Sequence, residues 1–390
     1  MYTVAVAHQG QSFPGPAFDK PLYRIPALGL TTTERILAAF DVRQDWRDLP
    51  ADFDIALRTS DDQGRTWSEA RPLRQHTPGH GFGDASFITD PVTGRICCWY
   101  VGSTGESYFS VAADRPGLEL WLSTSDDNGD TWTHRDLSHL RPGGVGGMFT
   151  SSGNGTVLAD GRLVQPFVAR IGEEDWAVCA VSADHGDTWV VGHPVGPGCD
   201  ENKVLGLAVP PGSSSGLTSG AESAAVLMHA RATPHRRQAL SIDGGFSFSE
   251  PVPVPALVDP ACNGGLVRVG PVLVATMCDD PTGRARLSIH LSLDDGESWG
   301  QAILVDDGAA AYSVACALDE KTVGLMWEAD NYEQILFATI TLGELGVRID
   351  GSGRVSWSRD AVELIARTGV PGQAKPPVVH QNQVGKALMA

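Results

Sequence analysis

The chain has 390 residues, of which 42% are hydrophobic, and its formal net charge is −18 at pH 7. That much apolar material is enough for a large core, while the negative charge argues against nucleic acid and anionic membranes as partners. The 45 glycines and 25 prolines, with few long amphipathic stretches, indicate an all-β protein rich in turns.

The N-terminus and the cysteines indicate where the protein works. Residues 1–8 have no basic segment followed by an apolar core, so we expect no signal peptide. No apolar run is long enough to cross a bilayer. We therefore expect a cytoplasmic protein, while a missing leader or another route of secretion stays open. The seven cysteines, including the adjacent Cys97 and Cys98, lack paired spacing and are expected to be reduced core residues.

Candidate strands lie between turn-rich segments along the whole chain. In chain order they are residues 4–6, 55–59, 118–122, 177–181, 286–291, 323–327 and 335–340. Residues 286–291 alternate apolar and polar side chains, which predicts a strand that is covered on one face only. We expect residues 4–6 to join the strands at 323–327 and 335–340 in one sheet.

An eight-residue pattern, S-x-D-x-G-x-[ST]-[WF], occurs five times at intervals of 51 to 65 residues. Its copies begin at Ser60, Ser125, Ser182, Ser241 and Ser292. In each copy we expect the aspartate to accept hydrogen bonds from the turn backbone, the glycine to take a positive φ and the aromatic ring to cover the adjacent core.

Such a repeat every four short strands predicts the blades of a β-propeller. The length of the chain allows six blades, so we expect an all-β, six-bladed β-propeller over residues 1–345. Residues 346–390 are expected to form a C-terminal extension that packs on the propeller or is partly flexible, with a short helix at 360–367.

The motif Arg24-Ile25-Pro26, followed by the five repeats, resembles the bacterial exo-α-sialidases (neuraminidases) of the Asp-box superfamily, a group similar to glycoside hydrolase family 33. The likeness runs from about residue 23 to residue 340, and its landmarks occur in the family's order. It implies a monomeric retaining hydrolase that releases terminal α-linked sialic acid from glycans or small sialosides. It implies no metal and no cofactor.

In that family three arginines hold the carboxylate of sialic acid. The resemblance places them at Arg24, Arg231 and Arg284, with Arg286 as the alternative to Arg284. A guanidinium suits this task because it stays charged and its planar fork matches the two oxygens of a carboxylate. A single arginine is more often part of a surface ion pair, so the assignment depends on finding all three together.

The segment after Arg43 resembles the family's acid/base loop. It implies that Asp48 protonates the leaving oxygen and then deprotonates water, with Asp45 and Asp52 as flanking alternatives. By the same resemblance Arg43 and Asp84 contact polar substituents of the sugar.

Tyr312 matches the family's nucleophile, and Glu201, in the D-E-N-K segment 200–203, matches the glutamate that takes its proton. The anomeric carbon of sialic acid carries a carboxylate, which would repel a carboxylate nucleophile but not a neutral phenol. With a pKa near ~10 the phenol needs a base within reach. Trp46 is expected either to line the pocket or to cover the blade beside it.

Two other functions stay open on the sequence alone. The same scaffold could act on deaminated sialic acid or transfer the sugar to another acceptor, as a trans-sialidase does. Alternatively, the chain could be a non-catalytic propeller that binds a partner. That module would have no need for arginines on several blades together with a tyrosine and glutamate pair, so the hydrolase is the leading hypothesis.

Overall fold

The computed structural model describes residues 1–14, 18–111, 117–207 and 224–358. Within these ranges one short 3-10 helix, η1 (Ser138–Leu140), is described in full, and no helix is long and apolar enough to cross a membrane. All other regular structure there is β-strand, which confirms the all-β prediction. The helix expected at residues 360–367 lies outside these ranges.

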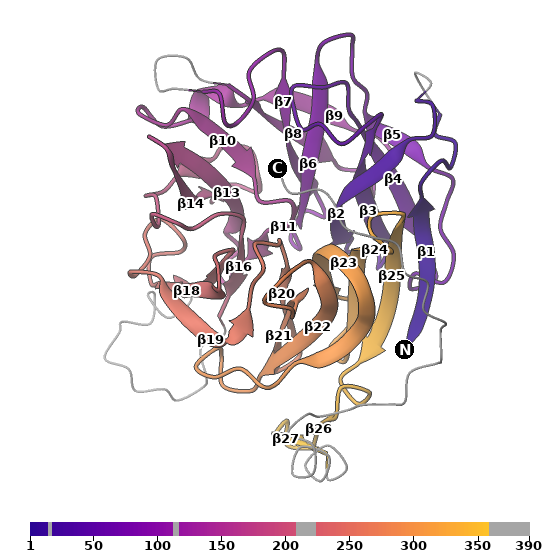
Figure 1. Ribbon diagram of the computed structural model, residues 1–390. Helices are drawn as coiled ribbons and strands as arrows, with labels where there is room; N and C mark the ends of the chain where they lie inside the picture. Colours follow the sequence, from indigo (N-terminus) through magenta and orange to yellow (C-terminus); the bar gives the residue numbers. More distant parts are fainter. Residues whose placement is uncertain (15–17, 112–116, 208–223, 359–390) are drawn as a thin grey trace.

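Four of the sheets contain strands that are mostly neighbours in the chain (Figure 1). The first is β2 (Leu22–Leu30), β3 (Ile36–Arg43), β4 (Asp54–Ser60) and β5 (Arg71–Arg74). The second is β6 (Gly81–Thr89), β7 (Ile96–Ser103), β8 (Glu119–Ser125) and β9 (Thr133–Asp136), with β11 (Gly153–Asn154) parallel to β6. The third is β10 (Gly147–Thr150), β12 (Thr156–Val157), β13 (Leu163–Ile171), β14 (Glu174–Ser182) and β15 (Val190–Val191). The fourth is β16 (Asn202–Gly206), β17 (Val226–Ala230), β18 (His235–Ser241) and β19 (Val252–Val258).

A seven-stranded sheet contains the C-terminal strands and the N-terminal one. Its members are β20 (Gly265–Val269), β21 (Val272–Cys278), β22 (Ala285–Ser292), β23 (Ile303–Ala317), β24 (Thr322–Ala329), β25 (Gln334–Thr341) and β1 (Tyr2–His8). The pairing of β1 with β25 agrees with the expected sheet. The long β23 pairs with β22 through its first half and with β24 through its second half. Because β23 joins two sets of four strands, the sheets do not separate into six units, and six blades closed into a ring stay a prediction.

The sheets lie around a common centre, with β2, β11 and β16 close to it (Figure 1). Neighbouring inner strands contact one another: β2 contacts β6 and β23, and β20 contacts β16 and β23. Sheets packed in this way are covered on both faces, so β3 and β7 are buried at every residue. The same packing contradicts the prediction of a half-covered strand at 286–291, because Ser288 and His290 on the polar side are each only 1% exposed.

The five repeated turns have one common geometry. In every copy the serine Oγ accepts the backbone N–H of the glycine at 2.8 to 2.9 Å, and the aspartate Oδ1 accepts the backbone N–H of the following Ser or Thr. The five glycines have φ between 82° and 93°, and each aromatic ring packs against a core cluster. The predicted turn chemistry is therefore confirmed at each copy.

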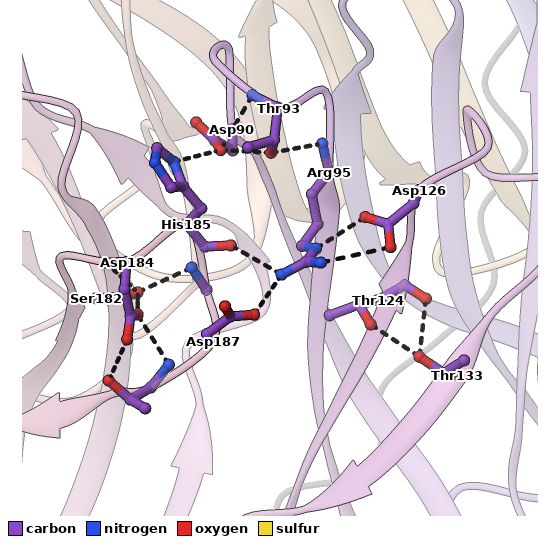
Figure 2. Close-up of polar contacts among 12 residues, drawn as sticks. Asp90, Thr93, Arg95, Thr124, Asp126, Thr133, Ser182, Asp184, His185 and Asp187 are labelled. Carbon is purple, nitrogen blue, oxygen red and sulfur yellow. Dashed lines mark hydrogen bonds and ion pairs between the residues drawn. The ribbon is translucent and has the colours of Figure 1, made fainter.

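Arginines connect the repeated turns of adjacent sheets, which the sequence did not indicate. Arg95 donates to Asp126 at 2.8 Å and to Asp187 at 2.6 Å, and these aspartates belong to the turns after β8 and β14 (Figure 2). Arg35 connects the turns after β4 and β8 in the same way. Since both aspartates bound by Arg95 are more than 60% exposed, each contact is worth at most about 1 kcal/mol and mainly fixes the spacing of the sheets.

The described part of the C-terminal extension forms a hairpin of β26 (Val347–Ile349) and β27 (Val355–Trp357). Its apolar side chains pack against the core cluster of the seven-stranded sheet. A domain boundary at residue 345 stays a prediction, and most of the extension lies outside the described ranges. All seven cysteines are free and buried, as expected of reduced core residues.

Two glycine substitutions, one in a repeated turn and one in the loop between β13 and β14, separate packing from backbone strain. Gly64 has φ +82°, and an added Cβ would lie 2.0 Å from the ring of Phe337, whereas Gly172 has φ +64° and open space around it. Gly172→Ala should cost about 1–2 kcal/mol of unfolding free energy from the left-handed backbone alone. Gly64→Ala should cost about 1–3 kcal/mol more, because the methyl group overpacks the core. Urea unfolding followed by tryptophan fluorescence measures both, and equal losses would contradict this account of the turn.

Candidate functional site

All eight predicted site residues line one cavity of about 590 Å³. They are Arg24, Arg43, Asp48, Asp84, Glu201, Arg231, Arg284 and Tyr312. They come from β2, β3, β6, β23 and the segments that flank β3, β16, β17 and β22. The volume lies within the range of pockets for small molecules, which is roughly 300–1,000 Å³.

Irregularities in strand pairing place several of these side chains. The pairing register shifts just after Arg24 in β2, around Asp84 in β6 and around Tyr312 in β23. Ile25 and Asp84 have φ near +60°, a backbone conformation that is uncommon outside glycine. A β-bulge turns a side chain away from the regular alternation of a strand, and here the bulges turn toward the same cavity.

Tyr312 lies among the three predicted arginines. Arg231 Nη1 donates to its phenolic oxygen at 3.1 Å. The guanidinium carbons of Arg284 and Arg24 lie 5.2 and 6.0 Å from the centre of its ring. Three cations from separate sheets therefore face one aromatic side chain.

Glu201 shares an arginine with that tyrosine. Arg231 Nη1 also donates to Glu201 Oε2 at 2.5 Å, so one nitrogen bridges the carboxylate and the phenol. Burial, followed by the nearby Glu201 carboxylate, raises the pKa of Tyr312 well above its usual 10, while Arg231 and Arg284 act in the opposite direction. The phenol is therefore protonated at neutral pH, and Glu201 is the adjacent group that can accept its proton.

Glu328 is a buried carboxylate that the sequence analysis missed. It pairs with Arg24 at 2.6 Å and also accepts the backbone N–H groups of Ile25 at 2.8 Å and Tyr312 at 3.2 Å. It lies in β24, directly after the apolar residues 323–327. A charged residue inside such a buried strand requires a partner, and that signal could have identified it.

Arg284 has a different environment. It donates to the hydroxyl of Tyr332 at 3.3 Å and to the carbonyl of Ala261 at 2.9 Å. Within the described ranges, no carboxylate lies within ion-pair distance of it. The alternative, Arg286, instead pairs with Asp307 at 2.8 Å and does not line the cavity. The structure thus favours Arg284 as an anion-binding residue.

Tyr332 is a second residue that the sequence analysis missed. Besides its contact with Arg284, its ring lies 4.4 Å from the guanidinium carbon of Arg24 and 5.2 Å from the ring of Trp46. Trp46 lines the cavity and is 55% exposed. Of the two expectations for Trp46, the structure therefore supports a place in the pocket wall, braced by Tyr332.

Asp48 stands at the edge of the cavity. Its Oδ1 accepts a hydrogen bond from Arg43 Nη1 at 2.8 Å, and its side chain is 74% exposed. The flanking Asp45 pairs with Arg47, Asp52 accepts the backbone N–H of Gly79, and neither lines the cavity. Among the three candidate aspartates of the predicted acid/base loop, only Asp48 lines the cavity.

Asp84 lines the cavity, and a second carboxylate, Asp41, lies fully buried beside it. Asp41 pairs with Arg43 at 2.7 Å and accepts the backbone N–H of Asp84 at 3.1 Å. Burial raises the pKa of Asp41 to about 6, although Arg43 lowers it. Burial and the neighbouring Asp41 raise the pKa of Asp84 well above its usual 3.8. The shift favours the protonated form of Asp84, whose carboxyl group lines the cavity.

Among the described residues, no group of three or more His, Cys, Asp or Glu side chains is placed to hold a metal ion. That the site works without a metal ion stays a prediction.

The family model of the BNR repeat-like domain matches residues 34–325, which is most of the chain. The chain belongs to the BNR-repeat (Asp-box) family. A curated sialidase from Micromonospora viridifaciens is 33% identical to this family member over 358 residues, which cover 84% of the chain and 52% of that relative. The chain thus spans about half the length of that relative, and the resemblance to Asp-box sialidases is confirmed at the level of the family.

Solved structures have a similar fold. A Hadza microbial sialidase matches with a TM-score of 0.73 at 24% identity, over 83% of this BNR-repeat chain and 66% of that one. An intramolecular trans-sialidase from Ruminococcus gnavus, in complex with oseltamivir carboxylate, matches with a TM-score of 0.72 at 16% identity. This match covers 88% of this chain and 100% of that one. These likenesses show that the BNR-repeat chain has the fold of the sialidase β-propellers.

The buried pair of Arg24 and Glu328 predicts a large effect of a small change. Glu328→Gln keeps the shape of the side chain but leaves the Arg24 guanidinium without its counter-charge, and Arg24 is only 8% exposed. Loss of one partner of a buried pair typically costs about 3–5 kcal/mol. The exposed pair of Arg47 and Asp45 is the control, and Asp45→Asn should cost less than about 1 kcal/mol. Urea unfolding of the two variants measures the difference, and a Glu328→Gln variant as stable as the control would contradict the argument.

Proposed function

We propose that this chain is a retaining exo-α-sialidase, which hydrolyses terminal α-linked sialic acid through a tyrosine-linked intermediate. One observation carries the proposal: three arginines from separate sheets surround Tyr312, and one of them also contacts Glu201. A cavity with several cations at its base suits an anionic sugar, and a phenol beside a carboxylate base suits nucleophilic attack.

Binding begins with the substrate carboxylate. Arg24, Arg231 and Arg284 grip its two oxygens, as the family resemblance implies. The charge of Arg24 is balanced by Glu328, and that of Arg231 by Glu201 and Asp200. Arg284 lacks such a partner among the described residues, so the substrate supplies the missing negative charge.

The first chemical step forms the covalent intermediate. Asp48 donates its proton to the glycosidic oxygen, and the bond between that oxygen and the anomeric carbon breaks. The oxygen of Tyr312 attacks the anomeric carbon as Glu201 takes the phenolic proton. Asp48 is exposed at the edge of the cavity, where the leaving group can depart into solvent.

The second step releases the sugar. Asp48, now ionised, removes a proton from a water molecule, which attacks the anomeric carbon. The bond to Tyr312 breaks, and Glu201 returns its proton to the phenolate. Arg43 and Asp84 contact polar substituents of the sugar during both steps, with Asp84 offering a hydroxyl group and Arg43 its guanidinium.

Hydrolysis of a fluorogenic α-ketoside of N-acetylneuraminic acid tests the assignments. The wild type should show clear turnover, and Tyr312→Phe should nearly abolish it because the nucleophilic oxygen is missing. Glu201→Gln should lower kcat by about 10²–10⁴-fold, the usual contribution of a positioned base. Asp48→Ala should reduce turnover of natural sialosides more than that of this activated substrate, since a good leaving group needs little protonation. A folded wild type without turnover on this substrate or on deaminated sialic acid would favour the binding-module alternative.

The stereochemistry and fate of the product test the two-step mechanism. Proton NMR during the first minutes should show the α-anomer of sialic acid appear before the β-anomer, because two displacements retain configuration. An initial β-anomer would contradict a covalent intermediate. Adding lactose as an acceptor should leave free sialic acid as the main product, and sialylated lactose in its place would assign the chain as a trans-sialidase.

A further inference from the structure

A lysine lies buried behind the proposed base. Lys203, in β16, is 1% exposed, and its ammonium group donates to the carbonyl of Ser152 and to Asn263 Oδ1 at 3.0 Å. Gly153 leaves room for it, because a Cβ there would lie 3.3 Å from Lys203 Cε. Within the described ranges, no carboxylate lies within 4.0 Å of the ammonium group. A buried cation without a directly bound anion is costly, so it calls for an explanation.

Asn263 connects this lysine to Glu201. Its amide oxygen accepts from Lys203, so its amide nitrogen is turned the other way, where it donates to Glu201 Oε1 at 3.1 Å and to Ser152 Oγ at 3.0 Å. Asn263 is 2% exposed and Glu201 is also 2% exposed. The lysine thus fixes the orientation of the amide, and the amide binds one oxygen of the carboxylate.

The two oxygens of Glu201 are therefore held by different partners. Oε1 accepts from Asn263, and Oε2 accepts from Arg231, whose same nitrogen contacts the hydroxyl of Tyr312. Oε2 thus shares one donor with the hydroxyl of the proposed nucleophile. With Oε1 occupied by a donor from behind, the carboxylate cannot rotate to exchange its oxygens without losing both contacts.

The charged groups around Glu201 come from several elements. Arg231 approaches from the end of β17, Tyr312 from β23, Asp84 from β6 and the adjacent Asp200 from the segment before β16. Lys203 approaches from β16, and Arg236 in β18 is the cation that repels it. Glu201 therefore lies between two carboxyl groups, Asp84 and Asp200, and two cationic side chains, Arg231 and Lys203.

We propose that Lys203 and Asn263 are positioning residues that orient the carboxylate of Glu201 and keep it ionised, so that its Oε2 can accept the proton of Tyr312. The inference rests on the proposed function of Glu201 as the base. Neither residue lines the cavity, so each acts through Glu201 and not on the substrate.

The protonation of Lys203 agrees with this role. Burial lowers the pKa of Lys203 to about 7, with Glu201 acting in the opposite direction. The ammonium group is therefore charged below pH 7, which is the range in which a glutamate gains its proton and loses its function as a base. Removing the charge of Lys203 should raise the pKa of Glu201, because an opposite charge nearby favours the ionised form.

The experiment measures kcat/KM against pH for the fluorogenic sialoside, since this ratio reports the groups of the free enzyme. Lys203→Met removes the charge and keeps most of the apolar volume. Asn263→Asp keeps the contact with Lys203 but replaces the donor to Glu201 by a negative charge. Gln165→Leu is the control, because Gln165 is also fully buried and hydrogen-bonded but donates to Ser86 and Pro166, away from Glu201 and Lys203.

Both test variants should move the acidic limb of the profile upward by about one pH unit or more, the usual effect of one nearby charge. Gln165→Leu should leave the limb where it is in the wild type. A merely structural role would lower kcat/KM at every pH without moving the limb. An active wild type whose limb stays unchanged in both variants would overturn the inference and leave the proposed function standing.

A second measurement does not depend on activity. Carbon NMR of protein labelled at the glutamate carboxyl carbons follows the titration of Glu201, identified by the signal that Glu201→Gln removes. Lys203→Met should raise this titration midpoint by the same amount as it moves the limb. A wild type without turnover would contradict the proposed function, whereas an unchanged midpoint in Lys203→Met would overturn the inference whether or not the protein is active.

Discussion

The carboxylate of Glu328 is the contact on which the site depends. It binds the guanidinium of Arg24 and the backbone of Ile25 at the bulge of β2, and it also binds the backbone N–H of Tyr312 in β23. One buried anion thus fixes a cation, a bulge and the proposed nucleophile relative to one another. Without it, three arginines around one tyrosine would repel each other in a poorly hydrated space, where unbalanced charge is most costly.

The scaffold and the site use different parts of each sheet. The repeated turns satisfy their own backbone groups and pack one aromatic ring into the core, so they specify where a strand ends and contribute nothing to the cavity. The bulges near Arg24, Asp84 and Tyr312 break the regular pairing and direct side chains into it. The two sets of irregular features can therefore change independently, which is consistent with one fold supporting several activities.

Local patterns predicted the fold class and the turns, because each of these is encoded within a few neighbouring positions. The eight predicted site residues came instead from the resemblance to the sialidase family, and all eight line the cavity. Glu328 and Tyr332 were missed because their partners lie far away in the chain. Arg24, for example, is 304 residues from Glu328. The strand at 286–291 was found, but its exposure was predicted wrongly, since a polar serine and histidine can be buried when neighbouring sheets cover both faces. Alternation of apolar and polar residues identifies a strand, but it predicts the exposure of that strand only when one face of the sheet meets water.

The joining of β1 to β25 has a consequence for how the protein is made. The N-terminal strand β1 has no pairing partner until β25 is synthesised, more than 300 residues later. The cavity likewise forms only when β2, β23 and β24 are all present. At about 5–20 residues per second on the ribosome, this delay lasts roughly 15 to 60 s. During that time β2 lacks its neighbour β23, and Arg24 lacks its partner Glu328. A nascent chain therefore has neither a complete core nor a complete cavity. Contacts of such long sequence separation also slow refolding, so the cavity is among the last parts of the molecule to be completed.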